Sequence, residues 1–186
     1  MVKINFPLSF ILIAAVLLRF FNLGGLPGGV FDEVYYPVLA LKLLSGQEYF
    51  SVHPPIGVYL TSISIYLHSI LPWTDSLLVT GFDINNIDPI SYRWLPAFIG
   101  VVLVYVSYLL SLQIYDKKYF PLLVALFFCL DGSMLVDSRF GLINIYLVFF
   151  GFLGLLFLFR AIKDPENLLA TFLSAVFVGL ALSVKW

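Results

Sequence analysis

The class of this protein is decided by residues 6–21, which read Phe-Pro-Leu-Ser-Phe-Ile-Leu-Ile-Ala-Ala-Val-Leu-Leu-Arg-Phe-Phe and carry a single charge, Arg19. A transmembrane helix needs about 20 predominantly apolar residues, so we interpret this stretch as a retained membrane helix. A Gly/Pro-rich turn over residues 22–30 follows, and then come two adjacent acids, Asp32 and Glu33. Because acids at a membrane surface are costly to desolvate, such a pair indicates chemistry or ion handling rather than packing.

The composition extends this interpretation to the whole chain. Of its 186 residues, 61% are hydrophobic and only 11% are charged, whereas soluble domains are about half apolar and a quarter charged. The excess apolar surface predicts an all-α integral membrane protein. The net charge of −1 gives no reason to expect a nucleic-acid partner, and the single cysteine, Cys129, excludes an internal disulfide.

Five stretches are candidate membrane spans, and we expect them at Phe6–Phe21, Tyr92–Tyr115, Tyr119–Val136, Leu142–Phe159 and Leu168–Val184. A sixth stretch, Ile56–Leu71, is shorter and carries a row of small or polar residues with helical spacing: Gly57, Thr61, Ser64 and His68. We expect this stretch to lie in the membrane interface, within an external loop that covers residues 22–91.

The distribution of basic residues favours one orientation. Cytoplasmic loops of membrane proteins carry an excess of Lys and Arg. With Lys3 inside, the basic pairs at 117–118 and 160–163 also fall inside, and the acids at 32 and 33 fall outside. The orientation gathers seven ionisable residues at the outer face, a pattern typical of an active site: Asp32, Glu33, His53, Arg93, Asp131, Asp137 and Arg139.

Asp32 and Glu33 are the first candidates for catalysis. A carboxylate beside an acceptor hydroxyl can act as a general base. The alternative is that the pair caps a following helix, Val34–Leu44, since acids favour helix amino termini. Neighbouring residues of a helix point about 100° apart, so we expect only one of the two acids to face a substrate.

Three basic residues could bind a phosphate. His53 precedes two prolines that fix the backbone, and the alternative is that it is simply exposed. Arg93 opens the second span and Arg139 follows the third; arginine forks match phosphate oxygens, although arginines at an interface also reach to lipid headgroups.

Three further charged residues are less specific. Asp131 lies inside an apolar run, where an acid needs a function or a partner such as Arg139 or Lys185. Asp137 could belong to an ordinary polar corner. Lys185 beside Trp186 is a common interface anchor. No metal-binding motif is present in the sequence, although Asp32 and Glu33 could bind a divalent cation through their oxygens.

Taken in order, six short motifs resemble the amino-terminal part of protein O-mannosyltransferases, a family of membrane glycosyltransferases with the GT-C fold. They are Arg19-Phe20, Phe31-Asp32-Glu33 with Tyr36, Val52-His53-Pro54-Pro55-Ile56-Gly57, Arg93-Trp-Leu-Pro-Ala-Phe-Ile-Gly100, Asp137-Ser138-Arg139-Phe140 and Leu180-Ala-Leu-Ser-Val-Lys185-Trp186. The resemblance covers nearly the whole chain.

The resemblance implies transfer of a sugar, typically mannose, from a polyprenyl-phosphate donor to a Ser or Thr hydroxyl of a polypeptide, with inversion. It implies that Asp32 is the base and that Glu33 orients the acceptor or a basic neighbour. His53, Arg93, Arg139 and Lys185 would bind the lipid phosphate, and Arg19 would anchor the loop. The resemblance requires no cofactor, and a divalent cation is an open alternative.

The resemblance leaves some features open. Family members are several hundred residues longer, so we expect a truncated chain, and an inactive fragment is one alternative. A transporter subunit is the alternative from another class, but it would place its charges at the bilayer midplane. Family members often pair with a homologue, yet Gly151 and Gly154 are too close for a GxxxG motif. We expect a plasma membrane location in a prokaryote, or the endoplasmic reticulum in a eukaryote.

Overall fold

The computed structural model describes residues 6–72, 82–115, 117 and 119–185. Within these ranges all regular structure is helical, as the sequence predicted. The longer helices are α1 (Phe6–Phe20), α2 (Tyr36–Leu44), α3 (Ile56–Ser69), α4 (Pro89–Ile114), α5 (Phe120–Leu130), α6 (Gly132–Arg139), α7 (Asn144–Lys163) and α8 (Leu168–Leu182). Two short 3₁₀ helices are η1 (Phe31–Val34) and η2 (Ile84–Asn86).

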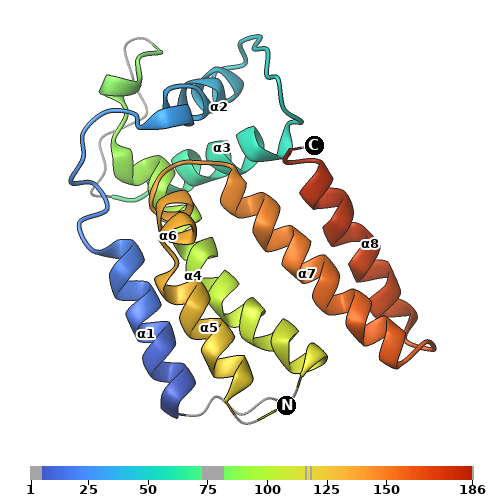
Figure 1. Ribbon diagram of the computed structural model, residues 1–186. Helices are drawn as coiled ribbons and strands as arrows, with labels where there is room; N and C mark the ends of the chain where they lie inside the picture. Colours follow the sequence, from blue (N-terminus) through green and yellow to red (C-terminus); the bar gives the residue numbers. More distant parts are fainter. Residues whose placement is uncertain (1–5, 73–81, 116, 118, 186) are drawn as a thin grey trace.

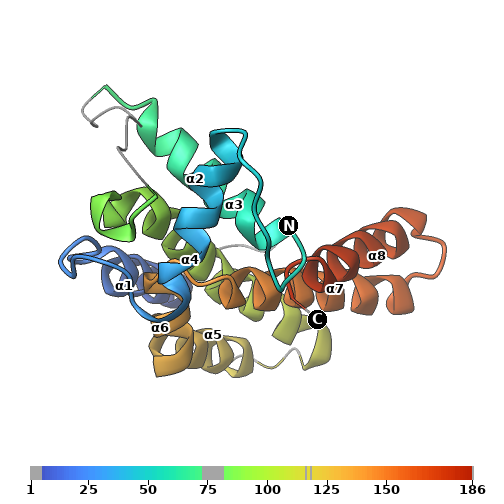
Figure 2. The same ribbon diagram turned by 90° about the horizontal axis from the view of Figure 1, so that it is seen from above.

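The helices form an upright bundle with a cap across one end (Figure 1). Helix α4 is central and contacts α1, α3, α5, α6 and α7, while α8 packs along α7 as a hairpin. Helices α2 and α3 lie across the end of the bundle, roughly perpendicular to the upright helices, and Figure 2 shows them from above. The residues that the sequence singled out in the first loop lie beside this cap, Asp32 and Glu33 just before α2 and His53 just before α3.

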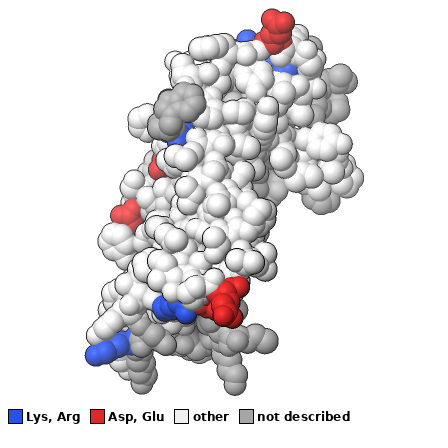
Figure 3. Space-filling view, turned by 90° about the vertical axis from the view of Figure 1, so that its right-hand side faces the viewer, with Lys and Arg blue, Asp and Glu red and all other residues white. Residues whose placement is uncertain are grey.

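Two single helices, α4 and α7, are long and apolar enough to cross a membrane by themselves. A third crossing is reached if α5 and α6 are counted as one bent span, and α1 and α8 are shorter apolar helices of 15 described residues each. In Figure 3 the face made by α7 and α8 is almost free of charge between the ends of the molecule. Such a face is suited to lipid.

The expected span Tyr119–Val136 is broken in the structure. Helices α5 and α6 meet at an angle of 55°. The break lies at Asp131, whose extended backbone ends α5 and whose side chain accepts a hydrogen bond from the Met134 amide, 2.9 Å away, as the N-cap of α6. The partner of this acid is therefore a helix amino terminus. The sequence left open a function or a salt bridge to Arg139 or Lys185, and neither of these two residues is among its described contacts.

Helix α3 lies across the bundle, as expected for an interfacial helix, but its polar face points inward. Gly57, Thr61 and Ser64 are buried, and the Ser64 hydroxyl donates to the Ser91 carbonyl of the α4 region, 2.7 Å away. Apolar side chains such as Ile63 face outward. The small polar residues allow close packing against α2 and α4, because their hydroxyls bond to nearby carbonyls.

Candidate functional site

The two adjacent acids point in different directions, as the sequence predicted. Glu33 is completely buried, whereas Asp32 is exposed. Both lie in η1, and α2 begins only at Tyr36, two residues later than expected. Glu33 closes the η1 turn by accepting a hydrogen bond from the Val30 amide at 2.8 Å. Glu33 therefore caps the turn, and Asp32 is the acid that remains exposed.

Glu33 forms a buried, two-pronged ion pair with Arg93 of α4. The Nε and Nη2 atoms of Arg93 donate to the two carboxylate oxygens of Glu33, and both distances are 2.7 Å. The remaining Arg93 donors bond to carbonyls of the loop before η1, those of Leu23, Leu26 and Gly28. All five N–H groups of a guanidinium are thus directed at protein acceptors.

The pair also fixes the connection that follows α6. The Gly141 amide donates to Glu33 Oε1 at 2.6 Å, and the Phe140 ring lies 5.2 Å from the Arg93 guanidinium carbon. A side chain at Gly141 would meet the Tyr92 ring at 2.7 Å, so this close approach requires glycine. The Glu33–Arg93 pair therefore holds together three segments that are distant in the sequence: the loop with η1, the start of α4 and the connection after α6.

The backbone just before Asp32 is strained. Phe31 has a φ of 52°, in the left-handed region that residues other than glycine seldom adopt. Its ring is exposed, so packing of the ring does not compensate for the strain. Strain of this kind persists where the surroundings hold the chain firmly, and it is frequent at functional sites.

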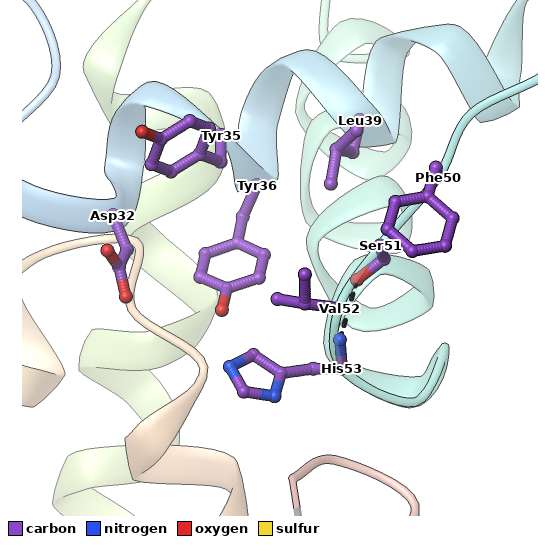
Figure 4. A pocket seen from close by; sticks show the side chains of 8 residues that line it. All are labelled: Asp32, Tyr35, Tyr36, Leu39, Phe50, Ser51, Val52 and His53. Atoms are coloured by element: carbon purple, nitrogen blue, oxygen red, sulfur yellow. Dashed lines mark hydrogen bonds between the residues drawn. The ribbon is translucent and has the colours of Figure 1, made fainter.

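Asp32 lines a pocket of about 330 Å³ between η1, α2 and the segment that leads into α3 (Figure 4). This volume lies within the ~300–1,000 Å³ range of small-molecule sites. The lining residues are Asp32, Tyr35, Tyr36, Leu39, Phe50, Ser51, Val52 and His53. The structure thus brings two of the predicted site residues, Asp32 and His53, to one cavity.

His53 is held in the rigid turn that its sequence suggested. Its backbone N–H donates to the Ser51 hydroxyl, 3.2 Å away, and its Nδ1 atom is buried with no hydrogen-bond partner within the described part of the chain. A buried polar atom without a partner is costly. In Figure 4 the other ring nitrogen, Nε2, is on the side turned to the pocket, and it is the atom that can meet a polar ligand.

Arg19 and Arg139 hold α1 against α5 and α6. The Nη2 of buried Arg19 donates to the Phe128 carbonyl near the end of α5 at 3.0 Å. Arg139 donates to carbonyls at the end of α1, those of Leu18 and Phe21. Arginines favour such positions because the last carbonyls of a helix lack partners.

Lys185 is positioned by a residue that the sequence did not identify as part of the site. Its Nζ donates to Asn144 Oδ1 at 3.3 Å, and Asn144 Nδ2 lies 3.5 Å from Asp137 Oδ1. The end of α8 is tied to the start of α3 by a bond from the Ile56 amide to the Ser183 carbonyl at 3.2 Å. Lys185 therefore lies at the same end of the bundle as the pocket.

A metal site does not emerge from this arrangement. Across the residues that the structure describes, no three His, Cys, Asp or Glu side chains gather closely enough to hold a metal ion. Asp32 and Glu33 point apart, so they do not form the carboxylate pair that could have bound a divalent cation.

Comparisons with known proteins show the family of this chain. The family model of dolichyl-phosphate-mannose-protein mannosyltransferases matches residues 9–186. The chain belongs to this family. It is 29% identical to protein O-mannosyltransferase 1 of Drosophila melanogaster, over 90% of this chain and 19% of that protein. It is 25% identical to polyprenol-phosphate-mannose–protein mannosyltransferase of Corynebacterium glutamicum, over 84% of this chain and 34% of that protein.

The fold is that of a solved member of this glycosyltransferase family. The whole chain superposes on 26% of a chain of the S. cerevisiae protein O-mannosyltransferase Pmt1-Pmt2 complex bound to the sugar donor, with a TM-score of 0.85 and 20% identity. This likeness confirms the predicted GT-C-like amino-terminal module. The chain spans about a fifth to a third of the length of these relatives.

Proposed function

We propose that this protein transfers mannose from a polyprenyl-phosphate donor to a Ser or Thr hydroxyl of a polypeptide, with inversion at the anomeric carbon. The observation that carries the proposal is the pocket, which has a free carboxylate, Asp32, near the imidazole of His53. The family and the names of the relatives support the choice of a mannosyl donor and a protein acceptor.

In this mechanism Asp32 takes the proton of the acceptor hydroxyl. The acceptor oxygen forms a bond to the anomeric carbon as the bond from that carbon to the phosphate oxygen breaks. The electron pair stays on the phosphate, and polyprenyl phosphate leaves. General base catalysis of this kind contributes about 10²–10⁴-fold to a rate, and Asp32 is suited to it because no hydrogen bond to another described residue occupies its carboxylate.

The leaving phosphate needs positive charge or hydrogen-bond donors. We assign this task to His53 and Lys185, which lie at the pocket end of the bundle and whose side chains have hydrogen-bond donors that no described residue occupies. For Arg93 we propose a positioning role, because its donors are occupied by Glu33 and by carbonyls. The phosphate-binding role of Arg139 stays a prediction, since two of its nitrogens already bond to the end of α1.

We place the pocket on the extracytoplasmic side. The loop between α4 and α5, with Lys117, and the loop after Lys163 lie at the opposite end of the bundle (Figure 1). A bond from Lys163 Nζ to Gln113 Oε1 at 3.2 Å ties that end together. Basic residues favour the cytoplasmic side. Pairing with a second member of the family is part of the proposal and is supported by the yeast complex.

The experiment is transfer of radiolabelled mannose from polyprenyl-phosphate-mannose to a Ser/Thr-rich peptide, in membranes that contain the protein as its gene encodes it. Asp32→Asn should reduce transfer by about 10²–10⁴-fold while the protein still inserts and unfolds at the same temperature. Glu48→Gln, which changes another exposed acid of the cap, is the matched control. Full transfer by the Asp32 variant would refute the assignment of the base.

A further inference from the structure

Tyr36 presents its hydroxyl to the middle of the pocket. The ring is 6% exposed and belongs to a buried cluster that includes Val58 and Ile143. In Figure 4 the hydroxyl points into the space between the Asp32 carboxylate and the His53 imidazole. The packed ring leaves this hydroxyl little freedom, so the position of its oxygen is set by the fold.

The Tyr36 hydroxyl forms no hydrogen bond with any other residue that the structure describes, and the Nε2 side of the His53 ring faces the same pocket. Hydroxyls of a folded protein nearly always have a partner, which is protein, water or ligand. The Tyr36 hydroxyl is open to the pocket and has no partner within the described part of the chain, so it can bond a polar group of a ligand.

The Tyr36 phenol stays neutral under ordinary conditions. Burial, and then the charge of the Asp32 carboxylate, raise the pKa of Tyr36 to about 12. A neutral phenol can both donate and accept one hydrogen bond. This capacity matches that of a sugar hydroxyl, which also donates and accepts.

The order of groups along the pocket decides which part of the ligand Tyr36 meets. Inverting transfer requires the acceptor oxygen and the leaving oxygen to lie on opposite sides of the anomeric carbon. With the base at Asp32 and the leaving phosphate bound at His53, the sugar ring lies between these two residues. The Tyr36 hydroxyl is directed to this place. We propose that Tyr36 is a sugar-binding residue whose hydroxyl hydrogen-bonds one hydroxyl of the transferred hexose. This inference rests on the proposed function.

The test pairs Tyr36→Phe with four polyprenyl-phosphate-mannose analogues that lack the 2-, 3-, 4- or 6-hydroxyl. The gene's full product is measured for both transfer and donor binding. Tyr36→Phe should reduce kcat/KM for the mannosyl donor about tenfold. With one of the deoxy donors, the kcat/KM of the wild type should fall by a similar factor. With the same donor, the kcat/KM of Tyr36→Phe should hardly fall further, because the variant has already lost that contact.

Each other outcome overturns a specific statement. If each of the four deoxy donors lowers kcat/KM by the same factor in the variant as in the wild type, the Tyr36 hydroxyl does not contact the sugar, while the proposed function stands. If the wild type neither binds nor transfers from the mannosyl donor, the proposed function fails, and the role of Tyr36 fails with it. Tyr59→Phe, an exposed tyrosine of α3 outside the pocket, should keep the wild-type response to every donor.

Discussion

Glu33 and Arg93 lie 60 residues apart in the chain and form an ion pair in which both side chains are at most 1% exposed. Each carboxylate oxygen of Glu33 accepts one bond from Arg93 and one from a backbone amide, those of Val30 and Gly141. The pair joins the first loop, the start of α4 and the connection after α6. The backbone that carries Asp32, the neighbour of Glu33, is therefore held in place where Asp32 faces the pocket.

We predict that breaking this pair destabilises the protein strongly. Glu33→Gln and Arg93→Gln should each lower the free energy of unfolding by about 3–5 kcal/mol, because each leaves a buried charge or an unpaired polar group behind. The double variant should lose less than the sum of the two. The measurement is thermal unfolding in detergent, analysed as a double-mutant cycle. Single variants as stable as the wild type would contradict the buried pairing.

The close approach behind the pair gives a second prediction. Gly141→Ala should lower the free energy of unfolding by about 1–3 kcal/mol, since the added Cβ would lie 2.7 Å from the Tyr92 ring and push the 141 amide away from Glu33. Gly151→Ala is the matched control, because nothing lies within 4 Å of its Cβ position in α7. Equal stability of the two variants would show that the approach at Gly141 is not tight.

Hydropathy predicted the apolar helices well but could not predict the contacts between them. The expected span Leu168–Val184 corresponds to α8, Leu168–Leu182, because one run of apolar residues sets both. The bend at Asp131 depends on a capping bond, which an apolar profile does not contain. The local pattern around Asp131 did show an acid in need of a partner, yet it could not tell a helix cap from an ion pair.

The site was predictable in its residue types and less so in its pairing. The acids at 32 and 33 stood out because they follow a membrane helix, and their different directions follow from helical geometry. The bond between Glu33 and Arg93 is set by tertiary packing over a long sequence separation. Asn144 and Tyr36 were missed as site residues, because an amide and a phenol give no charge signal until their neighbours are known.

The raised pKa of Tyr36 leads to a third prediction, about alkaline stability. An unfolded tyrosine ionises near pH 10, whereas Tyr36 in the folded protein has a pKa of about 12. The folded state therefore benefits from the neutral phenol below pH 10, and this benefit is lost as the pH rises from 10 towards 12. Tyr36→Phe should lose less stability than the wild type over this range. Parallel losses in thermal unfolding temperature, from pH 9 to pH 12, would contradict the shift.

The fourth prediction concerns Asn144, whose side-chain oxygen holds the Lys185 ammonium at 3.3 Å. Asn144→Leu should release Lys185 and raise the KM for the polyprenyl-phosphate donor by about 3–10-fold, the loss of one to two hydrogen bonds. The kcat should change less, because the base at Asp32 is not in contact with Asn144. Donor titrations at saturating peptide would measure both constants.

The opposite end of the bundle supplies the control for this prediction. Gln113 holds Lys163 at 3.2 Å through the same kind of amide–ammonium bond, far from the pocket. Gln113→Leu should leave the donor KM unchanged, although it removes a bond of the same chemistry. If both variants raise the KM equally, the effect comes from general loosening of the bundle, and Lys185 does not bind the phosphate. A rise confined to Asn144→Leu would place Lys185 at the donor.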